Sequence, residues 1–175
     1  MKRVFLLTIL GFFAFTATFG QKVFSICGDI VDITVNTSNW TVENDPDLFT
    51  IKPQGTDEES RLIVMIWQSF DPLAEDAVDA IANEAFDLVE DILADVVWAD
   101  DIAEFDNNDV YFAALDGAGY YVNDDGSKDR MTTSVMILAP DDVNLLALVF
   151  LGTSPAYKKW ESELLEIILS IKPTD

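Results

Sequence analysis

The sequence contains no histidine, a single cysteine and few basic residues. Its 175 residues include 10 Lys and Arg against 32 Asp and Glu, a formal charge of −22 at pH 7. Without histidine the chain cannot form a Ser-His-Asp or Cys-His nucleophile system, and it has no imidazole for zinc. Cys27 has no partner for an intramolecular disulfide, and we interpret it as a small buried apolar residue. These absences argue against most enzyme classes.

The shortage of basic residues also narrows the range of partners. Binding to nucleic acid depends on Lys and Arg facing phosphates, and binding to an anionic lipid surface depends on the same charges. With a sequence pI near 4.1, the chain is expected to bind neither. A protein partner or a cationic ligand is compatible with this charge.

Residues 1–20 have the layout of a secretory signal peptide. Lys2 and Arg3 are followed by an apolar stretch that ends at Phe19, and Thr18 and Gly20 are small enough for cleavage before Gln21. The apolar stretch is short for a membrane-spanning helix, which needs about 20 residues. We therefore predict a secreted or periplasmic protein whose mature part, residues 21–175, is one domain without a membrane anchor.

The mature chain shows two groups of strand patterns, each followed by a helix pattern. Strands are expected where apolar residues alternate with polar ones or form short runs bounded by turn residues. The expected strands before the first helix are 31–36, 40–43, 49–52 and 61–68, and those after it are 97–105, 110–122, 130–138 and 145–151. The run at 61–68 is apolar without alternation, which is typical of a central strand covered on both faces.

Two amphipathic helices accompany these strands. Asp71-Pro72 and Ser154-Pro155 each offer a cap followed by proline in the first turn. Apolar residues then recur every three or four positions as far as Val96 in the first helix and Ile171 in the second. Because short turns join the strands, we predict an α+β fold: an antiparallel sheet with a helix on each face, in the order βββ(β)-α-ββββ-α.

The closing segment carries a family resemblance. Residues 157–173, YKKWESELLEIILSIKP, and the preceding strand 145–151 with its turn Gly152-Thr153-Ser154 resemble the PsbP-like family, which includes Mog and DcrB-type proteins. The resemblance covers residues 29–173. It implies an α/β/α sandwich and a non-enzymatic role in binding or assembly, and it brings no catalytic motif with it.

Three groups of residues are candidates for a site. Asp100, Asp101, Glu104, Asp106 and Asp109 could supply oxygen ligands to Ca²⁺, although their spacing is not that of an EF-hand. Trp40 and Trp98 lie at the edges of predicted elements and could contact a ligand or partner. Asp116-Gly117-Ala118-Gly119 resembles half of a dinucleotide-binding loop, but it continues as a strand, so close backbone packing explains its glycines better.

The leading hypothesis is therefore an exported, acidic, non-enzymatic binding or assembly module whose partner is unknown. Two alternatives stay open. A carboxylate-dependent hydrolase would need two acids facing each other across a cleft, one of them with a raised pKa. A calcium-stabilised envelope protein would need several carboxylates around one ion.

Overall fold

The computed structural model describes residues 20–55, 61–69 and 76–174. The two helices are α1 (Ala77–Ile92) and α2 (Ser154–Leu169). The strands are β1 (Gln21–Ile26), β2 (Val31–Asn36), β3 (Trp40–Asn44), β4 (Phe49–Pro53), β5 (Leu62–Gln68), β6 (Ala94–Trp98), β7 (Ala103–Asn107), β8 (Val110–Val122), β9 (Lys128–Ala139), β10 (Leu146–Thr153) and β11 (Lys172–Pro173).

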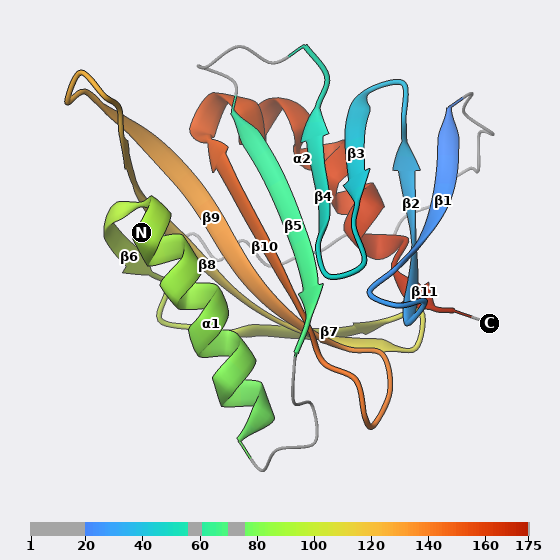
Figure 1. The fold of residues 1–175 in the computed structure, drawn as a ribbon. Helices are drawn as coiled ribbons and strands as arrows, with labels where there is room; N and C mark the ends of the chain where they lie inside the picture. The colour runs from blue at the N-terminus through green and yellow to red at the C-terminus, as the bar shows by residue number, and fades with distance from the viewer. Residues whose placement is uncertain (1–19, 56–60, 70–75, 175) are drawn as a thin grey trace.

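Most strands belong to one antiparallel sheet of order β3-β4-β5-β10-β9-β8-β6, with β7 also paired to β8. A smaller antiparallel sheet has the order β1-β2-β11. Figure 1 shows α1 in front of the large sheet and α2 behind it. The predicted fold class, an antiparallel sheet with a helix on each face, is confirmed.

The helices lie on opposite faces because the central strands bury both of their sides. In β10, Leu146, Leu148 and Phe150 belong to the core that contains the buried face of α2. The alternate residues Ala147, Val149 and Leu151 belong to the core beneath α1. Side chains alternate across a strand, so a strand that is apolar at every position needs cover on both faces. The same reasoning holds for 61–68, and β5 is indeed a central strand between β4 and β10.

The helix α2 begins at Ser154, as predicted, but its cap is Thr153, one residue before the cap expected from Ser154-Pro155. The Thr153 hydroxyl accepts a hydrogen bond from the Ala156 N–H at 3.3 Å, and proline occupies the first turn. This capping satisfies one of the backbone donors that a helix start leaves free. The helix ends at Leu169, and Lys172–Pro173 then pair with β2, so the chain after the helix is used to extend the small sheet.

The end of α1 differs from the prediction, which continued the helix to Val96. The helix stops at Ile92, Leu93 is extended, and Ala94–Trp98 form the edge strand β6 beside β8. Asp95 has φ = 54° at an irregularity in this pairing. Residues 94–98 thus form backbone hydrogen bonds with the edge of β8, although the spacing of Val96 would also fit a continued helix. The predicted helix start at Asp71-Pro72 lies outside the described residues.

Two further strand assignments are corrected. The expected strand 97–105 is two short strands, β6 and β7, both paired to β8 and separated by a bend at 100–101. The strand β1, Gln21–Ile26, was not predicted because its sequence QKVFSI lacks a clear alternation; it forms by pairing with β2. It begins at the residue expected to start the mature chain.

The predicted signal peptide, residues 1–20, lies outside the described residues apart from Gly20. Within the part of the chain that is described, neither helix is long and apolar enough to cross a lipid bilayer.

Candidate functional site

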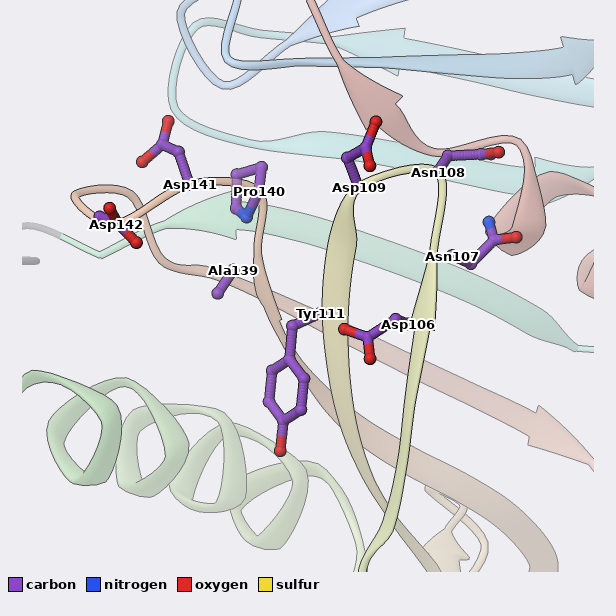
Figure 2. A pocket seen from close by; sticks show the side chains of 9 residues that line it. All are labelled: Asp106, Asn107, Asn108, Asp109, Tyr111, Ala139, Pro140, Asp141 and Asp142. Atoms are coloured by element: carbon purple, nitrogen blue, oxygen red, sulfur yellow. The ribbon is translucent and has the colours of Figure 1, made fainter.

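The candidate site is a depression at one end of the large sheet, on the face that carries α1. It has a volume of about 680 Å³ and is bounded by the β7–β8 turn and the β9–β10 turn (Figure 2). We call it the acidic depression, and its lining consists of Asp106, Asn107, Asn108, Asp109, Tyr111, Ala139, Pro140, Asp141 and Asp142. Four of these nine residues are carboxylates, and none is Lys or Arg.

Strand register explains why these residues meet. Asp106 on β7 pairs with Tyr111 on β8, and Tyr111 pairs with Ala139 on β9. Directly paired residues of antiparallel strands point to the same face, so these three side chains form one row across the sheet. Figure 2 shows Ala139 and Tyr111 below the two turns, with the Tyr111 ring pointing away from them. The β8–β9 pairing therefore brings residues 106–109 and 139–142 together.

The β7–β8 turn is held in place by its sequence. Asn108 and Asp109 have φ values of 50° and 62°, the left-handed region that a two-residue hairpin turn requires and that Asn and Asp tolerate. The Asn107 and Asn108 side-chain amides each donate to the Leu169 carbonyl at 2.8 Å. These bonds attach the turn to the C-terminus of α2, whose dipole is negative there.

The β9–β10 turn is organised around Asp141. One carboxylate oxygen accepts from the N–H groups of Val143 and Asn144 at 2.8 and 2.7 Å, and the other accepts from the Asn144 side chain at 2.7 Å. Hydrogen bonds from the Asn144 side chain and the Val143 N–H lower the pKa of Asp141. This carboxylate therefore stays charged, whereas the general acid of a glycosidase needs a raised pKa.

Tyr111 provides an aromatic wall for the depression. Its hydroxyl donates a 2.7 Å hydrogen bond to Glu104 on β7, and its side chain is 39% exposed. The pKa of Tyr111 is raised, first by the Glu104 hydrogen bond, then by burial and the charges of Glu104 and Asp106. The hydroxyl therefore remains protonated, and the exposed part of the side chain can contact an apolar or cationic group.

The five predicted metal ligands do not surround a common point. Asp106 and Asp109 line the acidic depression, Glu104 lies beside it on Tyr111, and Asp100 and Asp101 lie in the bend before β7. In the described part of the chain, no three carboxylate or thiol residues converge on a position that could hold a metal ion. The geometry resembles a charged surface more than a coordination site.

Trp40 is placed in the core. Its side chain is 1% exposed, its ring packs edge-on against Trp160 with centroids 5.4 Å apart, and its Nε1 donates to Glu163 at 3.1 Å. Glu163 also accepts from the Asn39 amide. The indole therefore connects α2 to the start of β3. Its ring is buried, whereas the predicted contact with a ligand or partner requires an exposed ring.

Trp98 is partly buried and packs over β8. Its ring lies 4.8 Å from that of Phe86, centroid to centroid, and its Nε1 donates to Glu90 at 3.1 Å. A Cβ added at Gly117 would lie 2.7 Å from the ring, so only glycine leaves room for the indole. The interpretation of these glycines as positions of close packing agrees with this contact.

Of the nine lining residues, only Asp106 and Asp109 are site candidates from the sequence, and the acidic and aromatic side chains missed are Tyr111, Asp141 and Asp142. The signal was present in part, because Pro140-Asp141-Asp142, between two predicted strands, is a sequence typical of a turn. In an antiparallel meander, the turn before β8 and the turn after β9 lie at the same end of the sheet. Combining the two acidic turns by this rule would have predicted the site.

No protein family model matches the chain, and no curated protein matches it. Similar folds occur among solved structures. The Ran-binding protein Mog1p of Saccharomyces cerevisiae has a TM-score of 0.53 and 10% identity, covering 89% of this chain and 96% of its own. The fold is of the Mog1 and PsbP type.

Two other structures share this Mog1-type fold. LpqN, involved in cell envelope biogenesis of Mycobacterium tuberculosis, has a TM-score of 0.52 and 13% identity, covering 83% of each chain. A protein of unknown function from Pseudomonas aeruginosa, PA94, has a TM-score of 0.51 and 10% identity, covering 86% of this chain and 94% of its own. At such identities the similarity establishes the fold alone.

Proposed function

We propose that this chain is an exported, non-enzymatic binding module that recognises a positively charged segment of a protein partner in the acidic depression. The observation that carries the proposal is the gathering of Asp106, Asp109, Asp141 and Asp142 around one hollow whose lining includes no basic side chain. Uncompensated like charges around a concavity favour the opposite charge there.

The anchoring of both turns supports the proposal. The β7–β8 turn is bonded to the end of α2, and the β9–β10 turn is closed around Asp141. A surface that is already ordered loses little conformational entropy when a partner binds. Carboxylates, amide groups and one tyrosine are groups that suit lysine and arginine side chains.

The similar structures are compatible with a binding role. Mog1p is described as a Ran-binding protein, and LpqN as involved in cell envelope biogenesis.

The export part of the proposal rests on the sequence pattern of residues 1–20. It can be tested by measuring the intact mass of the protein from its own cells, because the mature chain should begin at Gln21.

Binding in the depression can be tested with a fluorescein-labelled peptide of alternating lysine and serine. The test variant combines Asp106→Asn, Asp109→Asn and Asp142→Asn; Asp141 is kept because its turn depends on it. The matched control, Asp79→Asn with Glu84→Gln and Asp87→Asn, removes three charges from exposed positions of α1. Both variants have the same net charge.

We expect the depression variant to bind the peptide about 10- to 100-fold more weakly than the unchanged protein, from about 0.5–1 kcal/mol for each exposed charge. The control should lose less than about threefold, and affinity should fall with added salt because exposed charges are screened. Equal losses in the two variants would show that only the overall charge attracts the peptide, and the proposed site would be rejected.

A further inference from the structure

A second exposed surface lies on the opposite face of the large sheet, beside α2. We call it the open sheet face; it consists of Val97 on β6, Ala118, Tyr120 and Val122 on β8, and Lys128, Arg130 and Thr132 on β9. Register fixes these positions, because Val97 pairs with Ala118, Tyr120 with Arg130 and Val122 with Lys128. Paired residues and those two apart along a strand share one face.

The helix α2 does not reach this part of its sheet. Tyr157 of α2 stacks on Phe150 of β10 with ring centroids 5.3 Å apart, and Phe150 pairs with the buried Ser134 of β9. Beyond Ser134 the strands β8 and β9 continue toward their hairpin, which extends past both helices in Figure 1. Among the residues that the structure describes, no helix covers this part of the sheet on the α2 side.

The open sheet face is apolar at its centre. Val97 is 71% exposed, Val122 46% and Tyr120 37%. Single exposed apolar side chains are common on protein surfaces, but these three occupy neighbouring same-face positions on two adjacent strands. A contiguous patch of this kind marks a binding surface more often than an isolated residue does.

The open sheet face carries two basic side chains, Lys128 and Arg130, in an acidic molecule, and the exposed Asp116 is the next same-face residue along β8. Lys128 Nζ lies 2.9 Å from Asp95 and 5.5 Å from the centre of the Tyr120 ring. Arg130 is exposed beside Tyr120, and among the described residues no carboxylate forms an ion pair with it. In a chain with 32 acidic residues, an arginine left unpaired next to an exposed tyrosine can attract a carboxylate from outside.

The small area of the open sheet face favours binding of a short peptide segment over binding of a large protein surface. With strands about 4.8 Å apart and same-face residues about 6.8 Å apart, the face measures about 10 by 14 Å between its outer Cα atoms. A stable dimer buries about 800 Å² on each partner, several times this area. Two copies would also repel each other, because each carries a strong net negative charge.

We propose that the open sheet face binds an extended segment of a protein partner in which apolar side chains alternate with carboxylates. The apolar side chains would cover Val97, Tyr120 and Val122, and a carboxylate would pair with the Arg130 guanidinium. Arginine and tyrosine are the residue types that contribute most at such interfaces. This surface is distinct from the acidic depression, which lies at the other end of β8 and β9, so the two can be tested separately.

The test uses a fluorescein-labelled hexapeptide in which glutamate alternates with valine and phenylalanine, titrated with the protein up to millimolar concentration at physiological salt. One comparison peptide replaces glutamate with lysine, and another replaces the apolar residues with serine. The protein variants are Arg130→Gln, Val97→Ser and Tyr120→Ser, all at exposed positions. Lys158→Gln, on the exposed side of α2, is the matched charge control.

We expect the glutamate peptide to bind and both comparison peptides to bind at least fivefold more weakly. Arg130→Gln should reduce affinity for the glutamate peptide at least fivefold, the two serine variants at least threefold, and Lys158→Gln and the acidic-depression variant less than twofold. Absence of binding, equal binding of the lysine peptide, or equal loss in Lys158→Gln would overturn the proposal. So would a dimer in sedimentation that Val97→Ser dissociates, because a second copy would then be the occupant.

Discussion

Substitution of Gly117 by alanine should destabilise the domain through one contact, the packing of Trp98 on β8. A Cβ at position 117 would lie 2.7 and 2.9 Å from two carbons of the indole and 3.1 Å from the Thr133 methyl. Carbon atoms in van der Waals contact are about 3.5–4.0 Å apart. The ring would therefore have to move by about 1 Å, or the strand would have to bend.

Neither adjustment is free of cost. If the ring stays and the strand deforms, overpacking costs about 1–3 kcal/mol. If the ring leaves, the hydrogen bond to Glu90 and the edge-on contact with Phe86 are lost, at about 1 kcal/mol each. Both routes give about 2 kcal/mol, which lowers the melting temperature of a domain of this size by about 4–8 °C.

A double-mutant cycle identifies the cause. Urea unfolding followed by circular dichroism gives the free energy of unfolding for the unchanged protein, Gly117→Ala, Trp98→Ala and the double variant. In the Trp98→Ala background the added methyl group has space, and alanine loses less backbone entropy than glycine in a strand, by about 0.5–1 kcal/mol. Gly117→Ala should then be neutral or slightly stabilising.

Gly117→Ala is thus expected to lower the free energy of unfolding when residue 98 is tryptophan and to leave it unchanged or raise it slightly when residue 98 is alanine. If Gly117→Ala costs the same free energy with and without the indole, the reasoning is refuted, because the penalty would then come from Thr133 or from the backbone. A stabilising effect in the unchanged background would equally refute it.

Two further predictions concern Cys27 and calcium. Burial raises the pKa of the Cys27 thiol to about 12 from 9.0, so the protonated thiol stabilises the fold below about pH 9, and up to about 4 kcal/mol of this stability is lost as pH rises toward 12. Between pH 8 and 10.5, unfolding experiments should therefore show a smaller loss of stability for Cys27→Ala than for the unchanged protein. Equal losses would contradict this prediction. Because the carboxylates at 100–109 do not converge, calcium and sodium chloride at matched ionic strength should raise the melting temperature equally, and a larger rise with calcium would reinstate the calcium-stabilised alternative.

Where the sequence was predictive, the signal was local and strong. Ser154-Pro155 predicts the start of α2, and the predicted strand 110–122 has the observed bounds of β8, Val110–Val122. The apolar run of β5 implied two covering layers, and both cores are present. These features depend on side-chain spacing and backbone capping, which are set by neighbouring residues in the sequence and not by distant contacts.

Where the sequence failed, contacts distant along the chain decided the outcome. Val96 continues the helical spacing of α1, yet the free edge of β8 draws Ala94–Trp98 into the sheet. Trp40 lies at the edge of an element, yet it is buried, and its indole N–H donates to Glu163 on α2, far along the chain. Such competition depends on which partner is nearby in space.

The amino-acid sequence is enough to establish the strong acidity, the absence of imidazole chemistry, and the apolar faces that predict two helices with a sheet between them. The positions at which charged side chains meet on the surface depend on how the strands pair in the folded protein. Antiparallel pairing of β8 with β9 joins Asp106 and Asp109 to Asp141 and Asp142 at one end, and leaves Arg130 beside exposed apolar residues toward the other. A surface is made of residues that are neighbours in space, and strand register, set by burial of the core, determines which residues those are.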